Sequence, residues 1–502
     1  MKVKTIIRLA AVAVAFPTAV AAQTVTKITT TEGNEWVQSK VKMQKKANAG
    51  AQLTVDANAQ GVAWRAWGTT FNERDWEALL MLTRDEQDEV FRNVFSPQGD
   101  LHFTRGRIAM NASDYGCSWY SCDEVQGDLE LRYFNIDRDK SSVIPMIRAA
   151  QKYYPNLTCW ASPWSPPSWM KITGDYPVVS SKYNKANPQI DYLLYGTVEG
   201  IDEDEMKFLG KRNDKFPRKL ATQDYFIQDP RYLQAYANYF CKFITAYKEQ
   251  GIPIDMVIYQ NEAYSYTPYP GCPWTAEGTI RFNRDYLSPT LRKQHPDVRL
   301  YLGTINSNRQ DHVEKVLSDE GLRKCIDGVA FQWEGREILP AIRKQYPDYH
   351  YICSENECGN GKMDWSGAER TFFLITDNAG QGCDEWYNWN FILTDRGTSV
   401  WGWNQNALIQ VDSKTRKLRY TAEYYAVKHF SHYVTPGSQM VGYLPKTTDG
   451  VMAVVFRLDK GGYAVVAGNT SDSARQLSVD IAGRNLSDSL LPHSMNTYIF
   501  KH

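Results

Sequence analysis

The chain has 502 residues, with 57 Lys and Arg against 57 Asp and Glu, so its formal net charge is zero. This balance argues against a nucleic-acid binder, which usually carries a basic excess to meet phosphate. After the N-terminus there is no run of about 18 apolar residues, which argues against a multi-span membrane protein. Apolar residues make up 43% and aromatic residues 13% of the chain, including 15 Trp. That composition provides a full core and a surplus of flat rings, which a sugar-binding surface needs.

Residues 1–22 have the pattern of a secretory signal peptide. Three cations within the first eight residues precede a short apolar stretch, Leu9–Ala15, and the small residues Val20–Ala22 suit cleavage before Gln23. The apolar stretch is too short to serve as a membrane anchor. We therefore expect the mature chain to be exported, with no membrane span of its own.

Short apolar runs alternate with helix-like segments from residue 61 to residue 429. Eight strands are predicted, at Val62–Trp67, Thr104–Met110, Leu157–Ala161, Met256–Tyr259, Val298–Gly303, Gly328–Trp333, His350–Ser354 and Glu385–Leu393. Helices are predicted between them, at Ser142–Lys152, Pro230–Gln250, Ala276–His295 and Glu337–Gln345. Eight strand–helix units of this kind favour the α/β class and a (β/α)8 TIM barrel.

The two ends of the chain have a different pattern. Residues 23–60 are polar and contain a possible edge strand, Leu53–Val55. From residue 430 to residue 502, short β-rich runs are separated by Gly- and Asn-containing turns. These runs are Met452–Phe456, Tyr463–Ala467, Gln476–Val479 and Asn496–Phe500. We predict an antiparallel β-sandwich made by residues 430–502, to which residues 23–60 contribute.

The connection between Met170 and Pro230 is about 60 residues long and has no clear core pattern. In a barrel it would overhang the active face, either as a functional loop or as a solvated insertion. The nine Cys residues include two pairs close enough in sequence for local disulfides, Cys117–Cys122 and Cys353–Cys358, but the spacing does not fix any pairing. Neither pair has zinc-site spacing, so no metal is expected.

The catalytic candidates are carboxylates at the ends of predicted strands. No motif of a serine hydrolase, P-loop NTPase, dinucleotide enzyme or zinc protease is present. Glu262 follows the strand Met256–Tyr259. Glu355 and Glu357 follow the strand His350–Ser354, and side chains two apart on an extended chain point the same way, so the pattern leaves both open. We favour Glu355 because it lies closer to the strand.

Aromatic and acidic residues flank these positions. The segment Trp160–Met170 contains three Pro, which stiffen a loop that presents Trp164 and Trp169 as a stacking platform or as a cover of the barrel. Asp114 follows the second predicted strand, where it can accept hydrogen bonds from sugar hydroxyls or hold Arg107. Two carboxylates on different strands, ringed by aromatics, fit glycoside hydrolysis: one protonates the leaving oxygen, and the other attacks carbon or activates water.

Several segments resemble glycoside hydrolase family 30, the glucosylceramidase-like group, over residues 61–500. They are Arg107–Tyr115, Ala161–Lys171, Asn261–Glu262, Ser354–Glu355, Trp389–Asn390 and His429–Ser431. The resemblance implies a (β/α)8 barrel with an attached β-sandwich, and a retaining mechanism that needs no cofactor. It implies that Glu262 is the acid/base and Glu355 the nucleophile. It also implies a sugar site that contains Asp114, Trp164, Asn261, Trp333 and Trp389.

The chain departs from the family pattern near the leaving group. Ala263 stands where the family usually has Pro, and Gln332-Trp333-Glu334 stands where His-Trp-Tyr is common. We expect an exported retaining β-glycoside hydrolase that cleaves β-glucosidic bonds, in a glucosylceramide-like substrate or a β-1,6-glucan. The alternatives are a β-xylosidase, β-fucosidase or β-galactanase, and a non-catalytic glycan-binding protein. The oligomeric state is not predicted.

Overall fold

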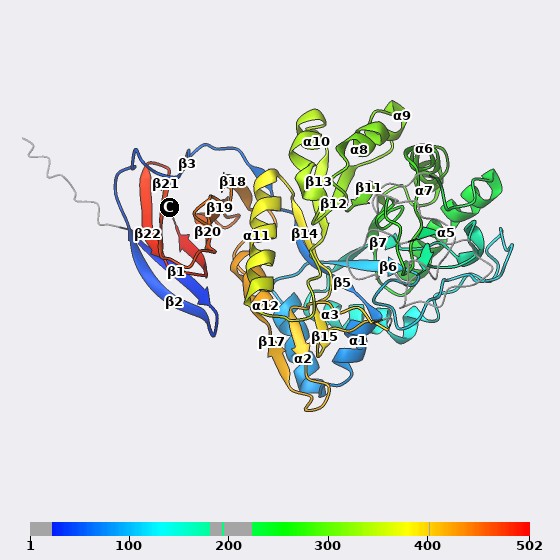
Figure 1. Ribbon diagram of the computed structural model, residues 1–502, viewed down its shortest axis with the longest axis horizontal. Helices are drawn as coiled ribbons and strands as arrows, with labels where there is room; N and C mark the ends of the chain where they lie inside the picture. Colours follow the sequence, from blue (N-terminus) through cyan, green and yellow to red (C-terminus); the bar gives the residue numbers. More distant parts are fainter. Residues whose placement is uncertain (1–22, 181–192, 195–222, 401, 502) are drawn as a thin grey trace, which may run out of the picture.

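The computed structural model describes residues 23–180, 193–194, 223–400 and 402–501, which form a barrel beside a β-sandwich (Figure 1). Eight parallel strands close the barrel in the order β10-β11-β12-β13-β14-β5-β6-β7. In chain order they are β5 (Ala66–Phe71), β6 (Arg105–Met110), β7 (Thr158–Pro163), β10 (Ile254–Ile258), β11 (Arg299–Ile305), β12 (Gly328–Gln332), β13 (His350–Glu355) and β14 (Glu385–Asn388). The predicted TIM barrel with an antiparallel β-sandwich is confirmed.

The first predicted strand, Val62–Trp67, is wrong as a single strand. Val62–Ala63 forms β4, which pairs with β18 (Gln439–Leu444) of the sandwich. Trp64 N then donates to Ser438 O, directly before β18, whereas Arg65 N donates to Asp384 O, directly before β14. The backbone thus changes partners between these two residues, and the first barrel strand begins at Ala66.

The last predicted barrel strand, Glu385–Leu393, is also two elements. β14 ends at Asn388, and Ile392–Thr394 forms β15 in a separate sheet with β16 (Ile409–Val411) and β17 (Leu418–Tyr420). Between them, Asn388 Nδ2 donates to Asn390 O at 2.6 Å, which turns the chain out of the barrel. The turn places Trp389 directly at the barrel rim.

Helices cover the outside of the barrel. They are α1 (Glu73–Leu79), α2 (Arg84–Phe95), α3 (Val143–Tyr153), α5 (Pro230–Glu249), α6 (Ala276–Arg281), α7 (Ser288–Gln294), α8 (Gln310–Leu317), α9 (Glu320–Arg323), α10 (Leu339–Gln345), α11 (Trp365–Gln381) and α12 (Ala422–Ser431). Short turns of helix are η1 (Asp139–Ser141), η2 (Ser168–Met170) and η4 (Gly335–Glu337), and the π-helical η3 (Phe282–Leu287) joins α6 to α7. The predicted helix Ala276–His295 is therefore three successive segments.

Helix α5 illustrates why these segments are helical. Asp229 caps its N-terminus by accepting from Arg231 N, and Pro230 occupies the first turn, where a missing N–H costs nothing. Buried Leu233, Tyr236 and Phe240 recur at intervals of three and four residues. This spacing forms the apolar stripe that packs on the barrel.

The sandwich is built from both ends of the chain, blue and red in Figure 1. Its larger sheet has the order β2-β1-β23-β20-β19-β18-β4 and its smaller sheet the order β22-β21-β3. The remaining bounds are β1 (Gln23–Thr31), β2 (Asn34–Met43), β3 (Leu53–Val55), β19 (Val451–Arg457), β20 (Tyr463–Asn469), β21 (Arg475–Ile481), β22 (Arg484–Leu490) and β23 (Ser494–Phe500). Leu53–Val55 is an edge strand, as predicted.

Helices α11 and α12 connect the barrel to the sandwich and lie between the two in Figure 1. Phe372 of α11 packs against Gly468 of β20, where a Cβ would come within 2.8 Å of its ring. His429 of α12 is fully buried and contacts Thr30 of β1 and Thr497 of β23 at 2.8 Å each. The sandwich is therefore fixed to the helices that follow β13 and β14.

Neither local cysteine pair is bonded: all nine Cys, which lie within the described residues, are free thiols. No helix in the described part of the chain is both long and apolar enough to cross a bilayer. A short pair of strands, β8 (Val179–Ser180) and β9 (Leu193–Leu194), belongs to the long connection after β7. Residues 181–192 and 195–222 of that connection lie outside the described residues, and so does the predicted overhang.

Candidate active site

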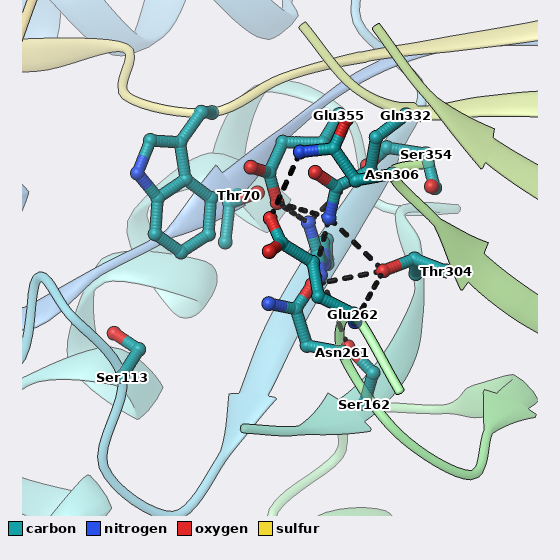
Figure 2. A network of polar contacts seen from close by, with 12 residues as sticks. Thr70, Ser113, Ser162, Asn261, Glu262, Thr304, Asn306, Gln332, Ser354 and Glu355 are labelled. Carbon is teal, nitrogen blue, oxygen red and sulfur yellow. Dashed lines mark hydrogen bonds and ion pairs between the residues drawn. The ribbon is translucent and has the colours of Figure 1, made fainter. Parts of the chain in front are cut away.

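The carboxyl ends of the barrel strands bring the predicted carboxylates together. Glu355 is the last residue of β13, and Glu262 follows β10 by four residues. Figure 2 shows both carboxyl groups within one network of polar contacts. Glu355 is 8% and Glu262 9% exposed, so each is buried but accessible. In TIM barrels this end of the strands carries the chemistry.

Arg107 of β6 links the two glutamate strands. Its guanidinium is fully buried and forms an ion pair with Glu355 through Oε2. Its second amino group donates to Asn261 Oδ1 at 2.7 Å and to Ser162 Oγ at 3.2 Å. The rigid fork of a guanidinium suits such simultaneous contacts. Arg107 therefore holds β6, β7, β13 and the residue before Glu262 in one arrangement.

The side-chain amide of Asn261 has its oxygen saturated by donors. Besides Arg107, Thr304 Oγ1 donates to this oxygen at 2.9 Å, and Gln332 Nε2 does so at 2.9 Å. Gln332 Nε2 also lies 3.3 Å from Glu355 Oε2. Because Oδ1 faces these donors, the Asn261 amide nitrogen points away from the network (Figure 2). It is placed to donate to a bound hydroxyl.

Glu262 is held by its backbone and by one carboxyl oxygen. Its φ of 48° lies in the left-handed region, which is unusual for a side-chain-bearing residue and typical of functional sites. Its N–H donates to Thr304 Oγ1 at 3.2 Å, and Asn306 Nδ2 donates to its Oε1 at 3.1 Å. The Asn306 oxygen accepts from Glu334 N at 3.2 Å, which fixes the amide orientation. The Glu262 carboxyl is thus aimed by Asn306, just after β11, whose own amide is held by the backbone just after β12.

Aromatic rings form one wall of the site. Trp164 and Trp389 are each 2% exposed, and their ring centroids are 5.0 Å apart. The Arg107 guanidinium lies 4.4 Å from the Trp164 ring centroid and 5.4 Å from that of Trp389. Both rings belong to one buried cluster with Tyr115 and Met363. Sequence-predicted Trp164 and Trp389 therefore lie together, against the side chain that holds Glu355.

Asp114 is 6% exposed and accepts a hydrogen bond from Gln405 Nε2 at 3.4 Å. Burial and the neighbouring Glu262 raise its pKa to about 7. Burial also raises the pKa of Glu355 to about 8, an effect that Arg107 opposes and that Glu262 and Asp114 reinforce. Burial thus opposes the ionised form of both carboxyls, and the Arg107 guanidinium favours the ionised form of Glu355.

Three other predicted residues have different surroundings. Trp333 directly follows Gln332, is half-buried and packs against the core around the barrel. Trp169 packs on Tyr232 of α5 and donates from Nε1 to Asp123 O, so it belongs to that core and not to the ring wall. Glu357 is paired with Arg370 at 2.6 Å, outside the network of Glu355.

Sequence reasoning assigned no role to four side chains of the network: Arg107, Thr304, Asn306 and Gln332. Only Arg107 carried a signal, because it is a charged residue directly before the apolar run Ile108–Met110 of its strand. The other three are neutral polar residues near strand ends, which a single sequence does not distinguish from turn residues. In the described part of the chain, no three His, Cys, Asp or Glu side chains are grouped to hold a metal ion.

Comparison with known proteins agrees with this geometry. The profile of the glycosyl hydrolase family 30 TIM-barrel domain matches residues 64–192 and 224–434. The chain is 26% identical over 489 residues to predicted glucosylceramidase 3 of Caenorhabditis elegans. The match covers 93% of this chain and 85% of that one.

Two solved structures share the fold. SrfJ from Salmonella typhimurium has a TM-score of 0.78 at 20% identity, covering 95% of this chain and all of that one. The endo-β1,6-glucanase BT3312 has a TM-score of 0.75 at 21% identity, covering 95% and 99%. With the family profile matching most of its length, the chain belongs to glycoside hydrolase family 30 and is a glycoside hydrolase.

Proposed function

We propose that this protein is an exported, retaining β-glycosidase that cleaves β-glucosidic bonds. The observation that carries the proposal is the shared network of Glu262, which follows the fourth strand of the barrel by four residues, and Glu355, which ends the seventh (Figure 2). Relatives named as a glucosylceramidase and as an endo-β1,6-glucanase both support a β-glucosidic substrate. Double displacement requires two such carboxyl groups, one as nucleophile and one as acid/base.

The contacts of Glu355 favour one of its oxygens as the reacting atom. Among the described residues, both side-chain contacts of Glu355, from Arg107 and Gln332, go to Oε2. Oε1 is therefore the oxygen that forms the bond to the anomeric carbon. Arg107 stabilises the carboxylate before the attack and when it leaves in the second step. Glu357, paired with Arg370 outside the network, lacks this arrangement.

Glu262 acts on the other side of the same bond. Asn306 donates to its Oε1, which leaves Oε2 to deliver a proton to the departing glycosidic oxygen. As the C–O bond breaks, the leaving group takes that proton and the sugar stays bound to Glu355. The Glu262 carboxylate then removes a proton from water, whose oxygen attacks the anomeric carbon and releases the Glu355 carboxylate.

The remaining predicted residues surround the sugar. Asp114 and the Asn261 amide nitrogen would bind its hydroxyls, and the buried rings of Trp164 and Trp389 would bound its apolar face. Trp333, on the strand-six side near Glu334, would border the leaving group. Hydrogen bonds to buried polar groups give such a site its selectivity between sugars.

Product analysis tests the mechanism and the substrate together. Proton NMR of the first product should show the β-anomer before mutarotation; an α-anomer as first product would contradict retention. A panel of glucosylceramide, β-1,6-linked gluco-oligosaccharides, β-xylosides, β-fucosides and β-galactans should give release only from β-glucosides. Binding without release of reducing ends would instead favour a glycan-binding protein, and release from another sugar would replace the glucoside assignment.

Export is tested by the N-terminus of the secreted protein. Cleavage before Gln23 would leave all of β1 intact. Protein recovered outside the cytoplasm should begin at Gln23, and an Ala22→Leu change should slow its processing. Unprocessed chain retained inside the cell would argue against export.

A further inference from the structure

The segment 358–363 follows Glu355 and leads into α11, and a single side chain organises it. Asn406 Oδ1 accepts from Gly361 N at 2.8 Å and from Met363 N at 3.3 Å. Asn406 N donates to Cys358 O at 2.6 Å. Three backbone groups of the segment are therefore bound to one residue.

Glu423 of α12 supplies the acceptor that Asn406 needs. Because Asn406 Oδ1 faces the segment, its Nδ2 points the other way and donates to Glu423 Oε1. Glu423 is 4% and Asn406 5% exposed. A Cβ at Gly367, in the first turn of α11, would come within 2.5 Å of Glu423 Oε1 and 2.7 Å of Asn406 Nδ2. Asn406 and Glu423 are thus packed against the first turn of α11, which leaves little room for another rotamer of either side chain.

The segment also borders the ring wall of the sugar site. Met363 belongs to the same buried cluster as Trp164 and Trp389, and Cys358 packs against that cluster. At its other end, only two residues separate Cys358 from Glu355. A shift of the segment would therefore move both the ring wall and the end of β13.

We propose that Glu423 is a positioning residue for the hydrolytic reaction: by holding the Asn406 amide, it fixes segment 358–363 and, through it, Trp389 and Glu355. The inference rests on the proposed function, because Glu423 acts only through residues assigned to the reaction there. No contact between Glu423 and the substrate is involved.

The charged groups around Glu423 favour its neutral form. Glu357, Asp364 and Arg370 line a polar cavity of about 160 Å³ beside it. Arg370 is already paired with Glu357, and Asp364 caps α11 by accepting from Gly367 N at 3.2 Å. Burial, reinforced by Asp364 and Glu357, raises the pKa of Glu423 to about 8. Below that pH the clamp operates without a buried charge.

Three variants of the full chain separate this role from general stability. Glu423→Leu removes the acceptor of the Asn406 amide, whereas Glu423→Gln keeps an acceptor oxygen but cannot ionise. Asp377→Asn is the matched control, since Asp377 is a 7% exposed acid on α11 that pairs with Arg336 at 2.8 Å, away from the segment. Backbone hydrogen exchange of residues 356–364 and kcat and KM on a β-glucoside are measured for each.

Glu423→Leu should raise exchange at Gly361 and Met363 about tenfold, since one hydrogen bond contributes roughly 1–1.5 kcal/mol. It should lower kcat by a similar factor with a smaller change in KM, and Glu423→Gln should restore both. Asp377→Asn should change neither, although it lowers the melting temperature.

Unchanged exchange in Glu423→Leu, or an equal increase in Asp377→Asn, would overturn the proposal, as would raised exchange without any loss of kcat. The exchange measurement needs no substrate. A wild-type chain that hydrolyses no β-glucoside would therefore contradict the proposed function alone, while the exchange data would still report on the clamp.

Discussion

Glu355 and Glu357 are two residues apart, but their carboxyl groups have different partners. Glu355 is bound by Arg107 and Gln332 within the barrel network, whereas Glu357 is paired with Arg370 beside α11. We expect Glu355→Ala to lower kcat by at least about 10⁴-fold, as loss of a nucleophile does. Glu357→Ala should retain most of the activity. Initial rates on an aryl β-glucoside measure both.

Chemical rescue sharpens this comparison. Azide added to Glu355→Ala should restore turnover and give an α-glucosyl azide, because the small anion enters the space of the lost carboxylate on the face opposite the leaving group. The same treatment of Glu262→Ala should give the β-azide. Rescue of Glu357→Ala with an α-azide product would move the nucleophile to Glu357.

Arg107 is expected to be irreplaceable by Lys. A point charge can pair with Glu355 but cannot also bind Asn261 and Ser162, which the guanidinium fork contacts together. Arg107→Lys should lower kcat/KM about a hundredfold, the equivalent of roughly 2.7 kcal/mol of lost charge-assisted hydrogen bonding. Arg105→Lys is the control on the same strand: Arg105 pairs with Glu385 at the opposite end of the barrel. It should lower the melting temperature without this kinetic effect; equal kinetic losses would refute the positioning role of Arg107.

The site was only partly predictable at this scale. Glu262 and Glu355 could be found because each follows an apolar run, and the end of a run marks a barrel rim. Arg107, Thr304 and Gln332 could not be paired with them, because their contacts join residues 23 to 248 positions apart in sequence. Such partners depend on the closure of the barrel, and local patterns contain no information about closure.

Among the elements, a predicted strand was right where its whole apolar run pairs within a single sheet. The predictions Thr104–Met110 and His350–Ser354 are examples: the observed strands, Arg105–Met110 and His350–Glu355, each have every residue but one buried. Val62–Trp67 failed because its hydrophobic residues serve two sheets in turn. Hydropathy reports burial but not the identity of the covering element. For the same reason β18, whose six residues are all half-buried, gave no strand signal.

Lys171 shows how two loops of the active face are joined. Its ammonium is 2% exposed and donates to Tyr176 O at 2.6 Å and Gly271 O at 2.7 Å, which ties the loop after β7 to the loop after Glu262. Lys171→Met would remove both of these charge-assisted hydrogen bonds: Tyr176 O would keep only its bond from Gly271 N, and Gly271 O would lose its ammonium donor. We expect a loss of about 2–4 kcal/mol in the free energy of unfolding, with a lower kcat because the Glu262 loop loosens.

Urea denaturation and steady-state kinetics measure both effects. Lys242→Met is the control, because the Lys242 ammonium donates to a single carbonyl, Leu131 O, from an exposed position on α5. Its loss should cost less than about 1 kcal/mol. Equal losses of unfolding free energy in Lys171→Met and Lys242→Met would show that the two hydrogen bonds of Lys171 stabilise the protein no more than the single one of Lys242.

On the scale of the whole molecule, the sandwich is held to the barrel by residues from both chain ends. Thr30 lies on β1 and Thr497 on β23, and both meet His429 on α12, the last helix of the barrel. The β-rich patterns at the two chain ends predicted a sandwich made from both, but they did not predict how it attaches to the barrel. These hydrogen bonds depend on one imidazole whose partners are 68 and 399 residues away.

The hydrogen bonds around His429 define its tautomer. Thr497 Oγ1 donates to His429 O at 2.9 Å, so it must accept from Nδ1–H. Thr30 Oγ1 accepts from Trp36 N at 3.1 Å and donates its proton to Nε2. A second ring proton, on Nε2, would face the Thr30 hydroxyl proton. Protonation of His429 therefore removes the hydrogen bond from Thr30 to Nε2, one of the contacts between α12 and the sandwich.

Acid should consequently loosen the molecule at this contact. Burial lowers the pKa of His429 to about 3, whereas in the unfolded chain it is near 6.5. The unfolded state thus binds more protons below pH 6.5, so the stability from neutral His429 is fully present above that pH and is lost as the pH falls toward 3. Between pH 7 and pH 4 the loss from this residue should be about 3 kcal/mol.

His429→Gln should be less stable than the wild type at pH 7, and the difference in urea-unfolding free energy should shrink by that amount at pH 4. His102, His312 and His432 titrate in both proteins, so their contributions cancel in the difference; a gap that stays constant from pH 7 to pH 4 would show that His429 does not control acid stability.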